Sequence, residues 1–164
     1  MNLGQAFQGG VRYCVLMDDE IHEILLASDP PGDGSLERDF KADEIARKVA
    51  KWVESGEEFS YPFHVRGTAF QKEVYRTTQK IPKGKVTTYG AVARSIGSRA
   101  YRAVGQALGK NPTPLLVPCH RVIGSDRGLT GFGSGITLKR KILEAEGVEF
   151  EGEKVKKDYI LEKI

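Results

Sequence analysis

The stretch of residues 111–124 constrains the fold of this chain more than any other. Pro112 and Pro114 forbid a helix there and force an extended path, and the apolar residues 115–117 that follow predict a buried strand. The end of this strand carries four consecutive residues, Pro118, Cys119, His120 and Arg121. We therefore expect a thiol, an imidazole and a guanidinium to lie together at the end of one buried element.

Cys119 is the candidate nucleophile of this group. A cysteine thiol has an ordinary pKa of about 8.5 and is mostly protonated at neutral pH, so a working nucleophile needs a basic or cationic neighbour. Successive side chains of an extended chain point to opposite sides, so we expect His120 to take the thiol proton through a water molecule. His120 needs an acceptor that orients its ring. Glu146, at the end of the helix predicted for residues 136–146, is the best placed acid.

Other uses of Cys119 fit the sequence less well. A papain-like protease would need a distant histidine, and His22 and His64 stand in no telling context. A redox site would need a second cysteine nearby, whereas Cys14 is far away in the chain. The remaining alternative is that Cys119 is a small buried residue without chemistry.

The positive charge of the chain is concentrated on the segment that holds the thiol. The net charge is only +3, but residues 66–127 contain twelve Lys or Arg against the two acids Glu73 and Asp126. This segment therefore carries +10 and the rest of the chain −7. A scattered basic surface would produce the same excess. Because the excess lies beside Cys119, we expect a polyanionic partner.

Two short helices predicted for residues 89–96 and 99–108, with a Gly-Ser turn between them, form a helix-turn-helix pattern. Arg99 and Arg102 are three residues apart and are expected on the leading face of the second helix, which is thin because of Ala100, Ala103, Gly105 and Ala107. A thin helix with arginines can approach a nucleic-acid backbone closely. Enzymes that bind no DNA also contain such hairpins, so the prediction of DNA binding rests on the positive charge as well.

The N-terminal residues predict a small unit of different character. Residues 11–18 and 21–27 are β-rich runs joined by a short polar turn, residues 28–35 form a turn-rich loop, and residues 39–55 have helical periodicity. We therefore expect an α/β (α+β) fold, with a ββα-type domain over residues 1–60 and a mostly helical domain over residues 61–164. The charged residues after 147 are expected to form a tail.

Neither a structural zinc site nor a disulfide framework is expected. Cys14 and His22 are too few for a zinc site, which needs four ligands. Cys14 and Cys119 are the only cysteines, which fits a reducing compartment. The chain has no apolar run of the roughly eighteen residues that a membrane span needs, and it has no signal-peptide start. We therefore expect a cytoplasmic protein that does not associate with a membrane.

Several motifs match one known family in order and spacing. They are Pro118-Cys119-His120-Arg121-Val122, Arg102-Ala103-Val104-Gly105, Asn111-Pro112, the glycine-rich loop of residues 124–135, and Glu146-Gly147. On these motifs the chain resembles, over about residues 70–147, the O6-alkylguanine-DNA alkyltransferases, also called methylated-DNA–protein-cysteine methyltransferases. The resemblance implies a small N-terminal sheet domain and a mostly helical C-terminal domain with a helix-turn-helix.

The resemblance also implies an activity. Members of this family bind the minor groove, flip the damaged guanine out of the duplex and transfer its O6-alkyl group irreversibly to cysteine. Here Cys119 would be the acceptor, His120 would take its proton through water, and Glu146 would orient the imidazole. The expected partner is double-stranded DNA containing O6-alkylguanine. Each molecule would act once, as a monomer, without a cofactor or a metal.

Further positions are implied for DNA and substrate binding. Tyr89 would hydrogen-bond the guanine ring, Arg102 would fill the gap left by the flipped base, and Asn111 would tie the recognition helix to the active-site turn. Arg99 and Ala103 would share the DNA-facing helix with Arg102. The implied pocket residues are Pro114, Val122, Phe132 and Ser134, with phenylalanine at 132 where many relatives carry tyrosine. The competing function is a helix-turn-helix DNA-binding protein in which Cys119 is only structural.

Overall fold

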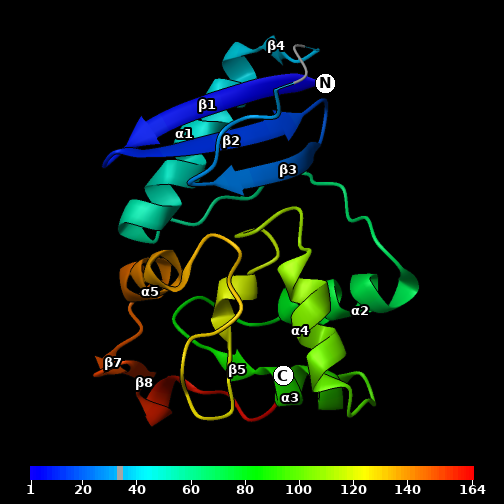
Figure 1. Ribbon diagram of the computed structural model, residues 1–164, viewed down its shortest axis with the longest axis vertical. Coiled ribbons are helices and arrows are strands. Elements are labelled where there is room, and N and C mark those ends of the chain that lie inside the picture. Colours follow the sequence, from blue (N-terminus) through cyan, green and yellow to red (C-terminus); the bar gives the residue numbers. More distant parts are fainter. Residues whose placement is uncertain (33–34) are drawn as a thin grey trace.

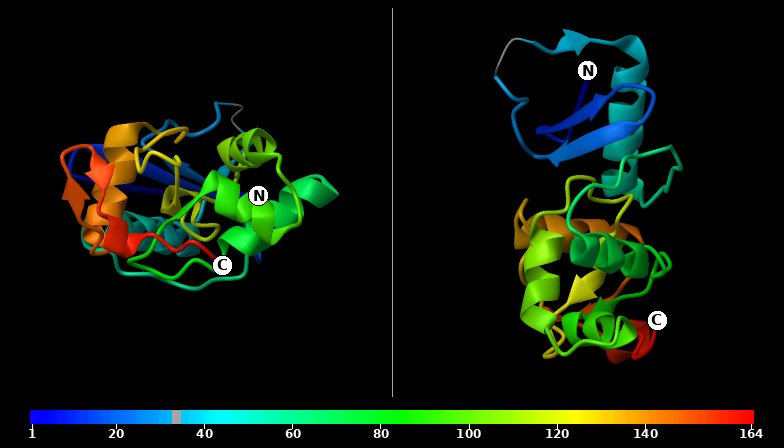
Figure 2. Two further views of the ribbon diagram at one scale, coloured as in Figure 1. Left: turned by 90° about the horizontal axis from the view of Figure 1, so that it is seen from below. Right: turned by 90° about the vertical axis from the view of Figure 1, so that its right-hand side faces the viewer.

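The computed structural model describes residues 1–32 and 35–164. The N-terminal part is a sheet covered by one helix, and the rest of the chain is mainly helical (Figure 1). The right-hand view of Figure 2 shows the two parts stacked end to end along the long axis. The expected mixed α and β architecture is confirmed. Residues 33 and 34 of the expected turn-rich loop lie outside the described part.

The N-terminal sheet has four strands in the order β3-β2-β1-β4. The expected hairpin is confirmed as β2 (Val11–Met17) and β3 (Ile21–Leu26), which pair antiparallel. The sheet is larger than the expected ββα unit, because β1 (Asn2–Gln8) pairs antiparallel with β2 and β4 (Glu37–Arg38) pairs parallel with β1. The boundary between domains at residue 60 stays a prediction.

Strand β1 was not expected because it contains Gly4, which weakens a strand signal. The structure shows why a glycine stands there: a Cβ atom on Gly4 would lie 1.9 Å from the carbonyl oxygen of Ala42. Ala42 belongs to helix α1 (Phe40–Ser55), which packs on the sheet. The glycine therefore allows the helix to approach the strand closely.

Helix α1 has the ends that its sequence predicts. Asp39 caps the N-terminus by accepting a hydrogen bond from the Ala42 amide, and Gly56 ends the helix with φ of 74°. The apolar face of α1, which includes Val49, Trp52 and Val53, is buried against the sheet. The lower end of α1 reaches the C-terminal part of the molecule (Figure 1).

The helical part begins with α2 (Ala69–Thr78), whose N-terminus is closed by a capping box between Thr68 and Gln71. Helices α3 (Tyr89–Ser95) and α4 (Tyr101–Gly109) pack together as the expected pair, and Thr88 caps α3. Helix α5 (Ile136–Ala145) then lies beneath the end of α1 (Figure 1).

The predicted start of α4 is wrong. The helix begins at Tyr101 and has no side-chain cap; the Ser98 hydroxyl instead accepts a hydrogen bond from the Ala100 amide before the helix starts. Arg99 consequently precedes the helix and does not share a helical face with Arg102. A serine that binds the amide two residues on favours a turn over continued helix.

The predicted strand over residues 115–117 is also wrong. Leu115 has φ of 76°, and the segment turns back so that Pro114 and Val117 form an isolated bridge. Residues Cys119–Arg121 then form the short 3-10 helix η1, followed by β6 (Val122–Ile123), which pairs parallel with β5 (Thr87–Thr88). The buried apolar character was predicted correctly, but its conformation was not.

The residues after 147 are not a tail. They form β7 (Phe150–Glu151), β8 (Lys154–Val155) and the short 3-10 helix η2 (Lys157–Tyr159). Leu161 donates its amide to the Val86 carbonyl at 2.7 Å and accepts from the Thr87 hydroxyl, so the chain end is bound to the strand before α3. In the described residues every helix is too short or too polar to cross a membrane.

Candidate active site

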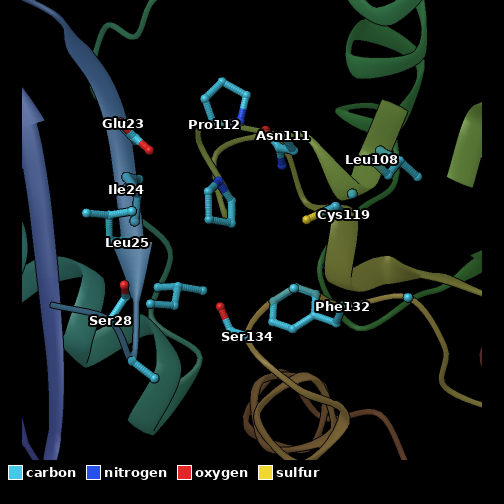
Figure 3. A pocket seen from close by; sticks show the side chains of 16 residues that line it. Glu23, Ile24, Leu25, Ser28, Leu108, Asn111, Pro112, Cys119, Phe132 and Ser134 are labelled. Atoms are coloured by element: carbon cyan, nitrogen blue, oxygen red, sulfur yellow. The ribbon is translucent and has the colours of Figure 1, made fainter. Parts of the chain in front are cut away.

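Cys119 lies on η1 at the wall of a cavity of about 400 Å³. Its side chain points into the cavity toward strand β3 (Figure 3), and only 8% of the residue is exposed. The opposite wall is formed by β3 residues and the loop after it, and the glycine-rich loop closes a third side with Phe132 and Ser134. The thiol therefore faces a small cavity between the N-terminal sheet and the helical part.

His120 and Glu146 are brought together as predicted. His120 Nε2 lies 3.0 Å from Glu146 Oε1, and both side chains are fully buried. His120 Nδ1 is also buried and has no hydrogen-bond partner in the part of the chain that the structure describes. Because a carboxylate accepts, Nε2 is the protonated nitrogen, which leaves the lone pair on Nδ1 free to accept a proton.

The electrostatics keep this pair in the state that a base requires. Burial would raise the pKa of Glu146, but hydrogen bonds from His120 and Arg121 and the positive charge of Arg121 outweigh it and hold that pKa far below its usual value. Burial lowers the pKa of His120, although Glu146 acts in the opposite direction. Glu146 is therefore a carboxylate and His120 a neutral imidazole near neutral pH.

Arg121 holds the site together rather than facing the cavity. Its Nε donates to Glu146 Oε1 at 3.0 Å, and its Nη2 donates to Glu146 Oε2 at 2.7 Å and to Glu58 at 3.2 Å. Its Nη1 donates to the carbonyl of Ile81 at 2.9 Å. These bonds fix η1 against its surroundings, as expected for a guanidinium fork on a carboxylate.

The Cys119 thiol is protonated in the resting site. Burial raises its pKa, while the Asn111 amide, the positive charge of Lys139 and nearby backbone amides lower it by less. Asn111 also donates to the Val117 carbonyl at 2.9 Å and accepts from the Thr113 amide, which ties the end of α4 to the turn before η1. Asn111 thus joins the end of α4 to this turn, and its part in DNA binding stays a prediction.

Tyr89 stands beside the cavity at the start of α3. Its hydroxyl donates to the Thr130 carbonyl at 3.0 Å, and burial raises its pKa, so the hydroxyl keeps its proton. Pro114, Phe132 and Ser134 line the cavity as predicted. Val122 does not line it: its side chain is fully buried and its carbonyl accepts from Lys139, so a role in substrate binding stays a prediction.

The residues predicted to contact DNA lie on or next to α4. Arg102 is exposed in the first turn of the helix, with its guanidinium 5.9 Å from the ring of Tyr101, which is itself 53% exposed. Ala103 is half-buried behind Arg102, and Arg99 is exposed just before the helix. Their contact with DNA stays a prediction.

Two residues of the site were missed by the sequence analysis. Trp52 donates its indole N–H to Glu146 Oε2 at 2.8 Å, and Lys139 donates to the carbonyls of Val122 and Thr130 at 2.7 and 2.8 Å. The helical spacing of Trp52 indicated only a core position. Lys139 is 1% exposed and burial lowers its pKa to about 8. Only the helical spacing of Lys139, which places it on the same face as Ile142 and Leu143, could have indicated it.

A metal site is not found in residues 1–32 and 35–164, where no three His, Cys, Asp or Glu side chains are grouped to hold an ion. Cys14 instead donates to the Ser28 carbonyl within the N-terminal unit. His22 stacks on His64 with ring centroids 5.4 Å apart and contacts Asp18 at 2.9 Å.

Comparison with known proteins supports one family. Residues 69–148 match the model of the 6-O-methylguanine DNA methyltransferase DNA-binding domain. Methylated-DNA–protein-cysteine methyltransferases of Methanosarcina barkeri and Methanosarcina acetivorans are 40% and 36% identical. Each alignment covers 82% of this chain, and 96% and 98% of the relatives respectively.

The fold agrees with solved structures of the same kind. The crystal structure of Mycobacterium tuberculosis OGT in complex with DNA superimposes with a TM-score of 0.78 at 33% identity, covering 89% of this chain and 92% of that one. The resemblance seen in the sequence motifs is thereby confirmed. With its thiol, histidine and carboxylate in place and its full-length relatives matched, the chain belongs to the methylated-DNA–protein-cysteine methyltransferases, a family of enzymes that includes the O6-methylguanine-DNA methyltransferases.

Proposed function

We propose that this protein repairs DNA directly, by transferring the O6-alkyl group of guanine in duplex DNA to Cys119 in one irreversible reaction. The observation that supports this most is the position of Cys119 on the cavity wall, beside a buried pair of histidine and carboxylate. A thiol faces a space of about 400 Å³, and the next residue is a buried histidine whose Nε2 is engaged by a carboxylate. We place the activity in the cytoplasm and in a monomer.

The first step is removal of the thiol proton. Because burial raises the pKa of Cys119, the thiol is not a resting thiolate and needs a base. His120 Nδ1 has a lone pair that no donor occupies, and a bridging water carries the proton from the Cys119 sulfur to this nitrogen. Cys119 and His120 are consecutive residues of the 3-10 helix η1 and not of an extended strand, and the unpartnered Nδ1 is what supports the relay.

The second step is displacement at the alkyl carbon. The Cys119 sulfur forms a bond to this carbon while the bond between the carbon and guanine O6 breaks, and the electron pair goes to the base. Guanine takes up one proton as it leaves, and His120 gives up the one that it took from the thiol, so that protons balance over the reaction. Tyr89, whose hydroxyl keeps its proton, is the donor that favours this departure when it exchanges its hydrogen bond to the Thr130 carbonyl for one to the base. The product is a thioether, which no side chain of the site can cleave, so each molecule acts once.

The reaction requires an extrahelical base, because the O6 group lies inside the duplex and Cys119 is buried. Helix α4 carries the exposed Arg102 that would occupy the vacated space. The superimposed Mycobacterium tuberculosis protein was solved with DNA, which supports a DNA partner for this chain. Because α4 is thin and has Arg102 exposed on its first turn and Arg99 exposed just before it, we assign this element to the minor groove.

The test is the mass of the intact protein after incubation with a duplex containing O6-methylguanine. We expect a gain of one methyl group in the wild type and in Cys14→Ser, and no gain in Cys119→Ser. Cys14 is the matched control because it is the other cysteine and is buried in the N-terminal sheet. A duplex that is bound without any gain in mass would contradict the proposal and leave the DNA-binding function alone.

A further inference from the structure

The carboxylate of Glu146 receives four hydrogen bonds, and one of them comes from the N-terminal unit. Oε1 accepts from His120 Nε2 and Arg121 Nε, both at 3.0 Å. Oε2 accepts from Arg121 Nη2 at 2.7 Å and from Trp52 Nε1 at 2.8 Å. Trp52 lies 94 residues before Glu146 in the chain, on helix α1. Each oxygen is thus held by two donors.

Trp52 is firmly placed. It is 3% exposed, and the ring of Phe59 meets it edge-on with centroids 5.7 Å apart and planes at 84°. One turn further along α1, Gly56 lies against the end of α5, where a Cβ atom would stand 2.2 Å from the Ala145 carbonyl oxygen. The two helix ends therefore meet through their backbones, directly beside Glu146.

Two ion pairs cross the same contact between the units. Glu54 binds Lys141 of α5 at 2.5 Å, and Glu58 binds Arg121 at 3.2 Å. Of the three residues Trp52, Glu54 and Glu58, only Trp52 contacts the Glu146 carboxylate itself. A buried indole N–H needs some acceptor, but here the acceptor is the group that orients the catalytic histidine.

We infer that Trp52 is a positioning residue for alkyl transfer, whose indole N–H fixes the Glu146 carboxylate so that His120 presents Nδ1 as the proton acceptor. The inference rests on the proposed function and deepens it. Without this N–H, Oε2 keeps Arg121 alone, and the carboxylate can rotate away from the geometry that fixes the imidazole. The N-terminal unit then contributes directly to the reactivity of Cys119.

The first experiment compares Trp52→Phe with the wild type, using free O6-benzylguanine at saturation and recording the rate of benzyl transfer against pH. The phenyl ring keeps most of the packing and removes the donor. We expect a rate about tenfold lower, because a hydrogen bond to a charged group is lost at a position that must be exact. A Glu146 carboxylate with one donor fewer is more basic and favours the protonated form of His120. The acidic limb of the profile, which reports protonation of His120, therefore moves to higher pH.

The pH readout belongs to the lost N–H because the other charges of the site stay in place. Lys139 faces His120 from α5, and Arg121 faces it from η1. Cys119 faces Lys139. Glu58 reaches the site only through Arg121. All four groups are unchanged in Trp52→Phe, whereas a purely structural role of Trp52 would lower the melting temperature without moving the profile.

The matched control is Glu54→Gln, which breaks the neighbouring ion pair to Lys141 without touching Glu146. We expect its transfer rate and pH profile to equal those of the wild type. An equal loss in both variants would overturn the inference, because the rate would then follow the contact between units. A wild-type rate and profile in Trp52→Phe would overturn it as well.

A second measurement does not depend on a folded variant of Trp52. The chain has one tryptophan, so its proton NMR spectrum contains one indole N–H resonance. We expect this resonance to move upfield in Glu146→Gln, where the charge-assisted hydrogen bond becomes a neutral one. No movement would overturn the inference. Failure of the wild type to take up benzyl would instead contradict the proposed function, while the indole resonance would still report the contact.

Discussion

Glu146 is a buried carboxylate that is stable only because of its neighbours. Removing a charge from water costs several kcal/mol, and paired donors must offset that cost. The fork of Arg121 supplies two of its four hydrogen bonds, and His120 and Trp52 supply the others. The same contacts that orient the base therefore decide whether this part of the molecule is stable.

Replacing Arg121 by methionine tests this dependence. Arg121→Met keeps much of the volume but leaves Glu146 with an unpaired buried charge, so we expect the free energy of unfolding at neutral pH to fall by about 3–5 kcal/mol. Denaturant unfolding measures it. The control is Lys51→Met, which breaks an exposed pair with Glu57, with side chains 62% and 59% exposed, and should cost less than about 1 kcal/mol.

The loss of stability in Arg121→Met should also depend on pH, in a direction that the pKa of Glu146 sets. Its pKa in the folded protein lies below the ordinary value of 4.5, so its pairing stabilises the fold above pH 4.5 and is lost as pH falls below it. In Arg121→Met that pKa rises. The difference between variant and wild type should therefore shrink on acidification, and a constant difference would contradict the assigned role of the pair.

Residue identities at the site were more predictable than residue contacts. Cys119, His120 and Glu146 carry recognisable chemistry, so the sequence and its family resemblance are enough to indicate them. Trp52 carries no such signal, because an apolar face at helical spacing predicts a core position whatever the indole N–H binds. Its contact depends on how two distant helix ends pack, which no local pattern contains.

The character of helix α4 was predictable from the sequence, but its first residue was not. Its thinness follows from its small residues, and Arg102 is exposed on its first turn. The sequence predicts both features but places the start two residues early, because serine often caps a helix whereas the Ser98 hydroxyl here binds the Ala100 amide in a turn. Since helix ends are decided by competition among local hydrogen bonds, a capping residue alone does not fix them.

The role of Arg102 predicts a difference between two substrates. Arg102→Ala should lower the transfer rate from an O6-methylguanine duplex by about tenfold or more, since a flipped base leaves a gap that costs a few kcal/mol. Transfer from free O6-benzylguanine needs no flipping and should change by less than about twofold. Arg47→Ala removes one exposed charge from α1 and serves as the control. Equal losses on both substrates would remove the flipping role.

The turn before η1 marks the limit of prediction at this scale. Prolines and apolar residues indicated a buried non-helical segment, and that part is correct. Leu115 nevertheless has φ of 76°, a backbone conformation that a leucine adopts only when its surroundings hold it. Leu115 is buried against the core of the N-terminal unit, and Asn111 binds the segment from the other side. Tertiary contacts thus decide the conformation.

In the whole molecule the cavity beside Cys119 lies between the N-terminal sheet and the helical part. Strand β3 forms one wall and Cys119 the other (Figure 3), while the end of α1 supports the base from behind through Trp52. The β2-β3 hairpin, helix α1 and the α3-α4 pair were predictable from periodicity. Strand β1 and the bound C-terminal segment were not, because each is held by partners far away in the chain.

The central claim is that Cys119 is a single acceptor, and counting repaired lesions tests it most directly. A known amount of protein is incubated with an excess of O6-methylguanine duplex, and both the repaired guanines and the methylated peptide are quantified. We predict a plateau of one repaired guanine per protein molecule, with the methyl group on Cys119. Repair that continues past one lesion per molecule, or a methyl group on Cys14, would contradict the claim.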